Sequence, residues 1–226
     1  DWRWSTHRLA HGTPKWPPGE RSAYHYLSYG FGLGEVVRRA TGRELPELMR
    51  EQIFEPLALS DAYLGLPTTE LGRAVPLQVE TPGGRAVELI LNSARVRQAV
   101  IPAGGISVTA HDLARFYRAM LAGGELAGVR VASAETIDQM RAQSSVDGEP
   151  DGLLHYPVRF GQGFQLGGPA VGWPAVEPFG HLSSRESFGH NGSNVCVGWA
   201  DPEHGLVVVY LGSRIRGWQT DRTMLR

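Results

Sequence analysis

The chain has 226 residues, 42% of them hydrophobic and 9% aromatic, which is enough to bury a sizeable core in one large domain or two small ones. Its formal net charge of -1 gives no electrostatic reason to expect a nucleic acid or an anionic membrane surface as a partner. The single cysteine excludes an internal disulfide, and no run approaches the roughly 18 apolar residues that a membrane span needs. The first residues show no signal-peptide pattern, which slightly favours the cytoplasm.

Turn-forming residues crowd the first 23 positions, with Thr13-Pro14 and Pro17-Pro18-Gly19 close together. This pattern predicts an extended approach segment rather than the start of a domain. Three tryptophans lie in it, Trp2, Trp4 and Trp16. Because large apolar side chains are costly to leave in water, we expect other parts of the chain to cover them.

A helix is predicted from about Leu27 to Thr41, with Gly42 as its stop. Apolar residues follow the 3.6-residue period at Tyr29, Leu33, Val36, Val37 and Ala40. The first turns also hold three glycines, each of which costs about 0.5–1 kcal/mol against alanine. Two readings stay open for them: close packing of the helix, or room for a ligand near Tyr24.

Further helices are predicted over 45–54, from a capping box at Thr109 and Asp112 to Gly123, and from Ser133 to about Met140. Residues 60–105 are irregular. Residues 158–166 are expected to form a strand, and two apolar runs, 194–201 and 206–211, predict an antiparallel hairpin. The second run is apolar on both faces, which implies helices on both sides of the sheet. Residues 217–226 resemble the opening of another helix.

Complete catalytic or metal-binding signatures are missing from the chain. It contains no Gly-x-Ser-x-Gly, no His-Glu-x-x-His and no Cys/His set with zinc spacing. We therefore expect neither a metal nor a cofactor.

Several stretches in chain order carry a family resemblance. Pro18-Gly-Glu-Arg-x-x-Tyr24-His25-x-Leu27-x-Tyr-Gly30 is followed by Ile53-Phe-Glu-Pro-Leu57, by Pro102-Ala-Gly-Gly-Ile-Ser107 and by Phe188-Gly-His-Asn-Gly192. Together they resemble the serine β-lactamase-related family, which includes class C β-lactamases, D-alanyl-D-alanine carboxypeptidases and related esterases. The resemblance runs over nearly the whole chain.

This resemblance implies an α/β (α+β) fold in which an antiparallel sheet is flanked by helices, incomplete at the N-terminus. Residues 1–226 are then one partial domain. Its mainly helical portion, 1–150, carries the second motif, and its C-terminal strands, 151–226, carry the third.

The resemblance also implies roles for particular residues. Tyr24 takes the place of the second-motif tyrosine, a general base and acid that needs a pKa lowered well below about 10 by neighbouring cations. His190 takes the third-motif position, and the amide of Ser193 is one oxyanion donor. His25, Tyr26, Asn191 and Gly192 are expected to line the substrate. Taken singly, Tyr24 is better explained as a buried tyrosine whose hydroxyl bonds to backbone, and His190 as a hydrogen-bonded turn histidine. The family resemblance reverses both interpretations in favour of a functional role.

The departures from the family pattern point to an esterase. Tyr24-His25-Tyr26 stands where β-lactamases have Tyr-x-Asn, and His190 stands where they have lysine. No serine is followed three places later by lysine, and Lys15 is the only lysine. We therefore expect the C-terminal part of a serine hydrolase domain, inactive alone, acting on a small ester or amide through an acyl-serine. The alternatives are a pseudoenzyme that keeps a binding cleft and a penicillin-binding carboxypeptidase or β-lactamase. Self-association through an exposed sheet edge is also expected.

Overall fold

The computed structural model describes residues 1–172, 177–193 and 195–216. The predicted helix over 217–226 and the first residue of the predicted hairpin, Asn194, lie outside these residues. The helices in chain order are α1 (Trp2–Ala10), α2 (Ser28–Thr41), α3 (Leu45–Met49), the π-helical turn η1 (Arg50–Phe54), the 3-10 helix η2 (Thr68–Arg73), α4 (Gly84–Leu91), α5 (Ala94–Arg97), α6 (Ala110–Leu121) and α7 (Ala134–Arg141). The strands are β1 (Tyr63–Leu64), β2 (Gln78–Glu80), β3 (Ile106–Ser107), β4 (Glu125–Leu126), β5 (Val129–Arg130), β6 (Gln165–Leu166), β7 (Phe188–Gly192), β8 (Cys196–Asp201), β9 (Leu206–Leu211) and β10 (Arg214–Arg216).

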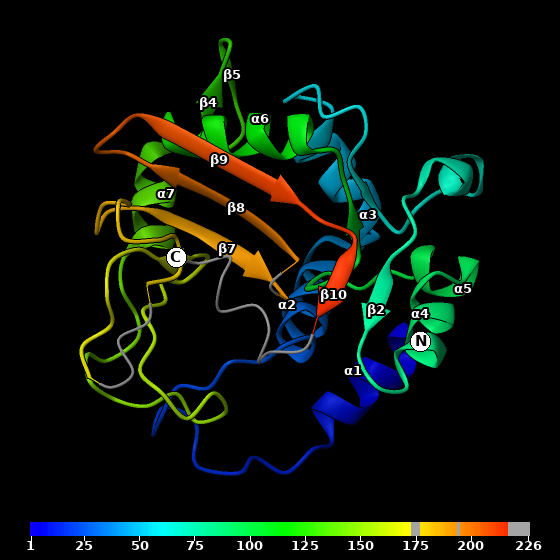
Figure 1. Ribbon diagram of the computed structural model, residues 1–226, viewed down its shortest axis with the longest axis horizontal. Coiled ribbons are helices and arrows are strands. Elements are labelled where there is room, and N and C mark those ends of the chain that lie inside the picture. The colour runs from blue at the N-terminus through cyan, green and yellow to red at the C-terminus, as the bar shows by residue number, and fades with distance from the viewer. Residues whose placement is uncertain (173–176, 194, 217–226) are drawn as a thin grey trace.

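The largest sheet has four antiparallel strands in the order β6-β7-β8-β9. Helix α6 lies along one face of it, as Figure 1 shows. Side chains alternate along each strand, so Phe188 and Ala200, both fully buried, pack on the α6 side. Their cluster includes Tyr117 and Met120 of α6 and Leu57 after η1. The expected architecture, an antiparallel sheet flanked by helices, is confirmed.

The caps of the later helices follow the sequence closely. Thr109 accepts a hydrogen bond from the amide of Asp112, and Ser133 caps α7 in the same way through Thr136. The capping box is only half formed, because the buried Asp112 carboxylate accepts from the amide of Asp61 at 2.7 Å instead. That bond ties the start of α6 to the loop before β1.

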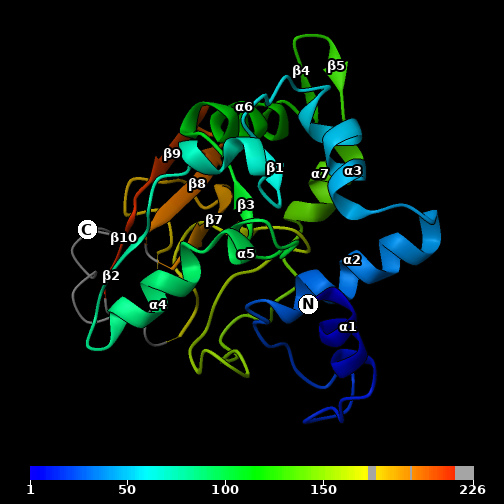
Figure 2. The same ribbon diagram turned by 90° about the vertical axis from the view of Figure 1, so that its right-hand side faces the viewer.

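The expectation of an extended approach segment is wrong for its first half. Residues Trp2–Ala10 form α1, which begins where the Asp1 side chain accepts from the amide of Trp4. Long-range contacts fix the helix against α2: the Trp2 indole donates to Glu35 at 2.8 Å and packs on Gly34. Figure 2 shows α1 beside α2, away from the main sheet. Trp4 was expected to be covered but is 65% exposed.

Helix α2 begins and ends as predicted, with Gly42 in the left-handed region. The face that it buries differs from the expected one. Its periodic apolar side chains are exposed, among them Leu33 at 56% and Val36 at 63%, whereas Gly30 and Gly34 are buried. A Cβ on Gly30 would lie 2.7 Å from the backbone nitrogen of Ala103, so close packing explains this glycine.

Two expectations about the last third need correction. Of the predicted strand over 158–166, only Gln165–Leu166 belongs to the sheet, because the backbone of Phe160 bonds to Ser144 and Ser145 instead. The hairpin is confirmed as β8 and β9 over the residues described. No second helix covers its other face within the described residues. Phe179 from a loop stacks on Trp199 there, and Tyr210 of β9 is 48% exposed.

Candidate active site

The fold brings together two residues that are far apart in the sequence. Tyr24 lies in the segment before α2, and His190 lies in the middle of β7 on the side of the sheet that faces α6. The Tyr24 hydroxyl and His190 Nε2 are 3.5 Å apart, at the outer limit of a hydrogen bond. Their ring centroids are 5.9 Å apart, with planes inclined by 25°. The two motifs that carry the family resemblance therefore meet in space.

The hydrogen bonds of His190 fix its tautomer. Its Nδ1 lies 2.5 Å from the backbone carbonyl oxygen of Asn191. A carbonyl oxygen can only accept, so Nδ1 carries the proton and the neutral ring keeps its lone pair on Nε2. The Tyr24 hydroxyl is then the donor toward His190.

The surroundings keep both groups neutral. Burial lowers the pKa of His190, which opposes its protonation. Burial also raises the pKa of Tyr24, and the neighbouring Tyr26 and Tyr29 raise it further. This direction is opposite to the one that a tyrosine base needs. In the surroundings that the described residues provide, Tyr24 is therefore a protonated phenol that donates a hydrogen bond.

The residues after His190 lie along a strand edge that is partly open. Strand β6 pairs with β7 only at Phe188 and Gly189, so the edge of β7 beyond Gly189 has no partner strand in the described part of the chain. Ser193 is exposed and has a left-handed backbone with φ of 49°, which is uncommon for a residue other than glycine. Its amide donates to no acceptor within the described residues. Gly192 packs against Cys196.

The remaining predicted site residues are arranged differently. Asn191 points to the face opposite His190 and donates to the buried Gln165 at 3.4 Å. The ring centroids of Tyr26 and Tyr24 are 4.8 Å apart with planes inclined by 81°, and Tyr26 is half exposed. His25 is exposed and bonds to Ser28 at 2.9 Å, so the structure does not bring it to His190.

Two neighbours of the site were not anticipated. Phe160 stacks on both Tyr24 and His190, and Gln165 holds the Asn191 amide. No local pattern singles out either residue, because each reaches the site through pairing with sequence-distant strands and loops. The run of glycines around them was the available signal that this stretch is not an ordinary strand.

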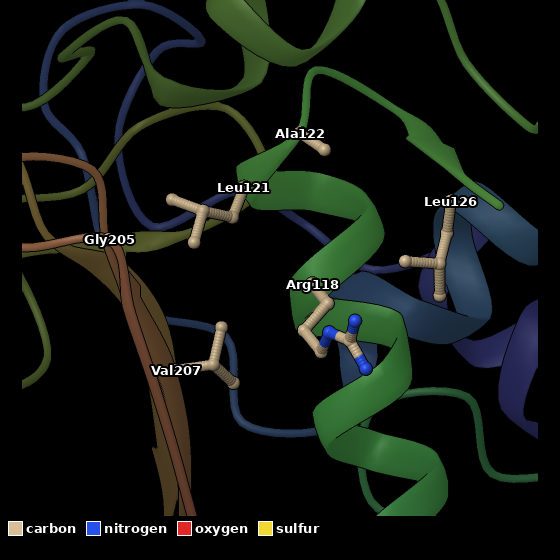
Figure 3. Close-up of a pocket in the computed structure, with 6 residues that line it drawn as sticks. All are labelled: Arg118, Leu121, Ala122, Leu126, Gly205 and Val207. Carbon is tan, nitrogen blue, oxygen red and sulfur yellow. The ribbon is translucent and has the colours of Figure 1, made fainter.

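Other features of the described residues do not add to this site. A groove of about 430 Å³ lies between the end of α6 and β9, lined by Arg118, Leu121, Ala122, Leu126, Gly205 and Val207 (Figure 3). None of these belongs to the predicted site. No group of three or more His, Cys, Asp or Glu in the described residues is placed to hold a metal. No helix among them is long and apolar enough to cross a membrane.

Comparisons with known proteins identify the family of this chain. The family model described as Beta-lactamase matches residues 1–222, and the chain belongs to this family. It is 28% identical over 224 residues to the esterase/beta-lactamase LipL of Mycobacterium tuberculosis, covering 86% of this chain and 49% of that protein. A putative D-alanyl-D-alanine carboxypeptidase of Escherichia coli O157:H7 is 25% identical, with 88% and 46% covered.

Solved structures give the same grouping. A penicillin-binding protein homologue from Caulobacter crescentus is 30% identical with a TM-score of 0.76, covering 96% of this chain and 59% of that one. A family VIII carboxylesterase is 26% identical with a TM-score of 0.78, covering 95% and 58%. The chain spans about half the length of the curated relatives that it matches.

Proposed function

We propose that this chain supplies the tyrosine and histidine half of an acyl-transfer site in a serine hydrolase. The substrate is a small ester or amide, and the reaction passes through an acyl-serine. The observation that carries the proposal is the 3.5 Å approach of Tyr24 to His190, which joins two family motifs across 166 residues. The 226 residues contain no Ser-x-x-Lys, so the nucleophile and its lysine have to come from another segment.

Because Tyr24 and His190 are both neutral, the segment that supplies the nucleophile must also supply a cation that lowers the pKa of Tyr24. An ammonium group near the Tyr24 hydroxyl would favour the phenolate and lower its pKa, against the effect of burial. Tyr24 then takes the serine proton and returns it to the leaving group. His190, with its lone pair on Nε2, accepts a hydrogen bond from the Tyr24 phenol whenever Tyr24 is protonated. The Ser193 amide, which donates to no acceptor in the part of the chain that the structure describes, is one oxyanion donor.

An esterase is favoured over a β-lactamase or a carboxypeptidase. His25 and Tyr26 replace the second-motif asparagine pattern, and His190 replaces a lysine. An imidazole whose pKa is lowered by burial carries no charge at neutral pH, so it lacks the cation that would pair with a substrate carboxylate. Simple esters carry no such group.

The experiment compares the 226-residue chain with the complete product of its gene, read from the native start codon. Both are treated with a short-chain nitrophenyl ester and a fluorescent penicillin. We expect turnover of the ester only by a product that contains Ser-x-x-Lys, and about a hundredfold loss in Tyr24→Phe. Tyr63→Phe is the control, since the Tyr63 hydroxyl donates to the Ser60 carbonyl at 3.1 Å. An acyl-serine adduct on the 226-residue chain alone would overturn the proposal.

A binding module without catalysis is the second candidate. It is favoured by the raised pKa of Tyr24 together with the missing nucleophile motif. A native start codon near Asp1, with no Ser-x-x-Lys in the gene product, would decide for it.

A further inference from the structure

Phe160 forms one corner of a triangle of rings with the candidate catalytic pair. Its centroid lies 5.6 Å from that of Tyr24 and 6.0 Å from that of His190. The planes are inclined by 13° and 30°, so both contacts are stacked. Both separations fall in the range in which aromatic pairs attract one another, about 4.5–7 Å. One ring therefore contacts both reacting side chains.

The backbone of Phe160 is held on both of its polar groups. Its amide donates to the Ser145 hydroxyl at 3.0 Å. Its carbonyl accepts from the amides of Ser144 and Ser145, at 2.8 and 3.2 Å, and from the Ser144 hydroxyl at 3.1 Å. The neighbouring Arg159 donates to the carbonyl of Gly167, which fixes the same segment against the residue that follows β6. Phe160 thus presents its ring from a rigid support.

The ring does not belong to the main hydrophobic core. The core cluster takes Phe164 and Leu166 from the same stretch, together with Tyr117 and Phe188, but not Phe160. The ring contacts of Phe160 are Tyr24 and His190, and it is only half-buried. A side chain so placed contributes to the geometry of the pair more than to the packing of the domain.

We infer that Phe160 is a positioning residue that sets the distance and the relative tilt of the Tyr24 and His190 rings. The inference rests on the proposed function. Tyr24 stands on a segment outside any regular element, so its hydroxyl is placed by the rings around it: Phe160, inclined by 13°, and Tyr26, inclined by 81°. Without the Phe160 ring, Tyr24 and His190 lose the side chain that stacks on both of them. A misplacement of about 1 Å is enough to slow proton transfer strongly.

The test uses three variants. Phe160→Leu removes the ring and keeps an apolar side chain, whereas Phe160→Tyr keeps an aromatic ring at this position. Phe179→Leu is the matched control, because Phe179 also stacks on an aromatic partner, Trp199 at 5.5 Å and 13°, but contacts neither Tyr24 nor His190.

The first measurement is the nuclear Overhauser effect between the ring protons of Tyr24 and His190 in this chain, which needs no activity. We expect Phe160→Leu to weaken it, and both Phe160→Tyr and Phe179→Leu to leave it at its wild-type strength. The second is ester turnover by the complete gene product. Here Phe160→Leu should lower kcat about tenfold with KM changed less than about twofold, and Phe160→Tyr should recover most of kcat.

The outcomes separate the two proposals. If Tyr24→Phe retains full turnover, the proposed function fails, whatever Phe160 does. If Tyr24→Phe is inactive while Phe160→Leu keeps wild-type kcat and a wild-type Overhauser effect between Tyr24 and His190, only the positioning role fails. A loss of kcat that Phe179→Leu reproduces and Phe160→Tyr does not recover would also overturn that role, because it would mark a general packing defect.

Discussion

Asp201 at the end of β8 offers the sharpest test of how the sheet behind the site is held. It is 1% exposed, and its Oδ2 accepts from the Ser184 amide at 2.8 Å and from His204 Nδ1 at 2.8 Å. Its Oδ1 accepts from the Ser184 hydroxyl at 2.6 Å and from the Glu203 amide at 3.0 Å. The carboxylate joins the loop before β7 to the β8–β9 turn.

Asp201→Asn keeps the shape but can keep only one acceptor oxygen. If that oxygen serves the Oδ1 partners, the new amide group faces the buried Ser184 N–H, donor against donor. The variant then loses the charge-assisted hydrogen bond from the Ser184 amide and leaves that buried N–H without an acceptor. We expect the free energy of unfolding to fall by about 3 kcal/mol. Glu203→Gln, an exposed change in the same turn, is the control and should stay within about 0.5 kcal/mol.

The pH dependence gives the effect a signature. Burial alone would raise the pKa of Asp201, but the hydrogen bonds from Ser184 and His204 outweigh it and hold that pKa well below its usual range. The contribution of the Asp201 carboxylate to the free energy of unfolding is therefore fully present above about pH 4, the pKa of aspartate in the unfolded chain. It is lost as pH falls through the lower pKa of Asp201 in the folded chain. The hydrogen bond to Asp201 raises the pKa of His204. The contribution of the Asp201–His204 pair to the free energy of unfolding is therefore fully present below about pH 6.5, and it is lost as pH rises through the higher folded pKa of His204.

Urea unfolding of the chain, followed by tryptophan fluorescence between pH 3 and 9, measures the difference between wild type and Asp201→Asn. We expect it to be largest between about pH 4 and 6.5. A difference below about 0.5 kcal/mol at pH 5.5, or one that grows as the solution becomes more acidic, would refute the reasoning.

Two further predictions concern the same sheet. A Cβ on Gly189 would lie 2.5 Å from both Cα and Cβ of Trp199, so Gly189→Ala should lower the unfolding free energy by about 3 kcal/mol. Gly72→Ala, which meets nothing within 4 Å, should be nearly neutral in the same urea titration. Among the described residues, strand β9 is an uncharged edge of the sheet, so the chain should self-associate in light scattering and Tyr210→Lys should shift it toward monomer. Leu182→Lys, at a loop position 93% exposed, is the control, and a monomeric wild type contradicts the prediction.

What the sequence predicted well is local. The ends of α2 and α6 depend on Gly42 and Thr109, whose effect reaches only the adjoining turn. The β8–β9 hairpin likewise follows from two apolar runs and a short turn. Helix α1 was missed because its stability depends on Trp2 reaching Glu35, a contact across 33 residues.

The approach of Tyr24 to His190 was predictable from sequence motifs, whereas the electrostatics of the pair were not. Tyr24 and His190 were chosen from motifs, and the structure places them together. Burial, which sets the pKa directions of both groups, depends on packing that no short pattern encodes. Phe160 was missed for a related reason: alternation predicted a strand through it, but hydroxyl and amide donors of Ser144 and Ser145 hold its backbone outside the sheet.

The separation of Tyr24 and His190 along the chain has a kinetic consequence. Their contact closes a loop of 166 residues, among the most non-local in the molecule, whereas the β8–β9 hairpin and the helices close over a few residues. Because the entropy lost on closing so long a loop is not repaid until the sheet has formed, we expect the pair to assemble late in folding. A partly folded chain is then expected to contain its strands and helices before Tyr24 and His190 come into contact.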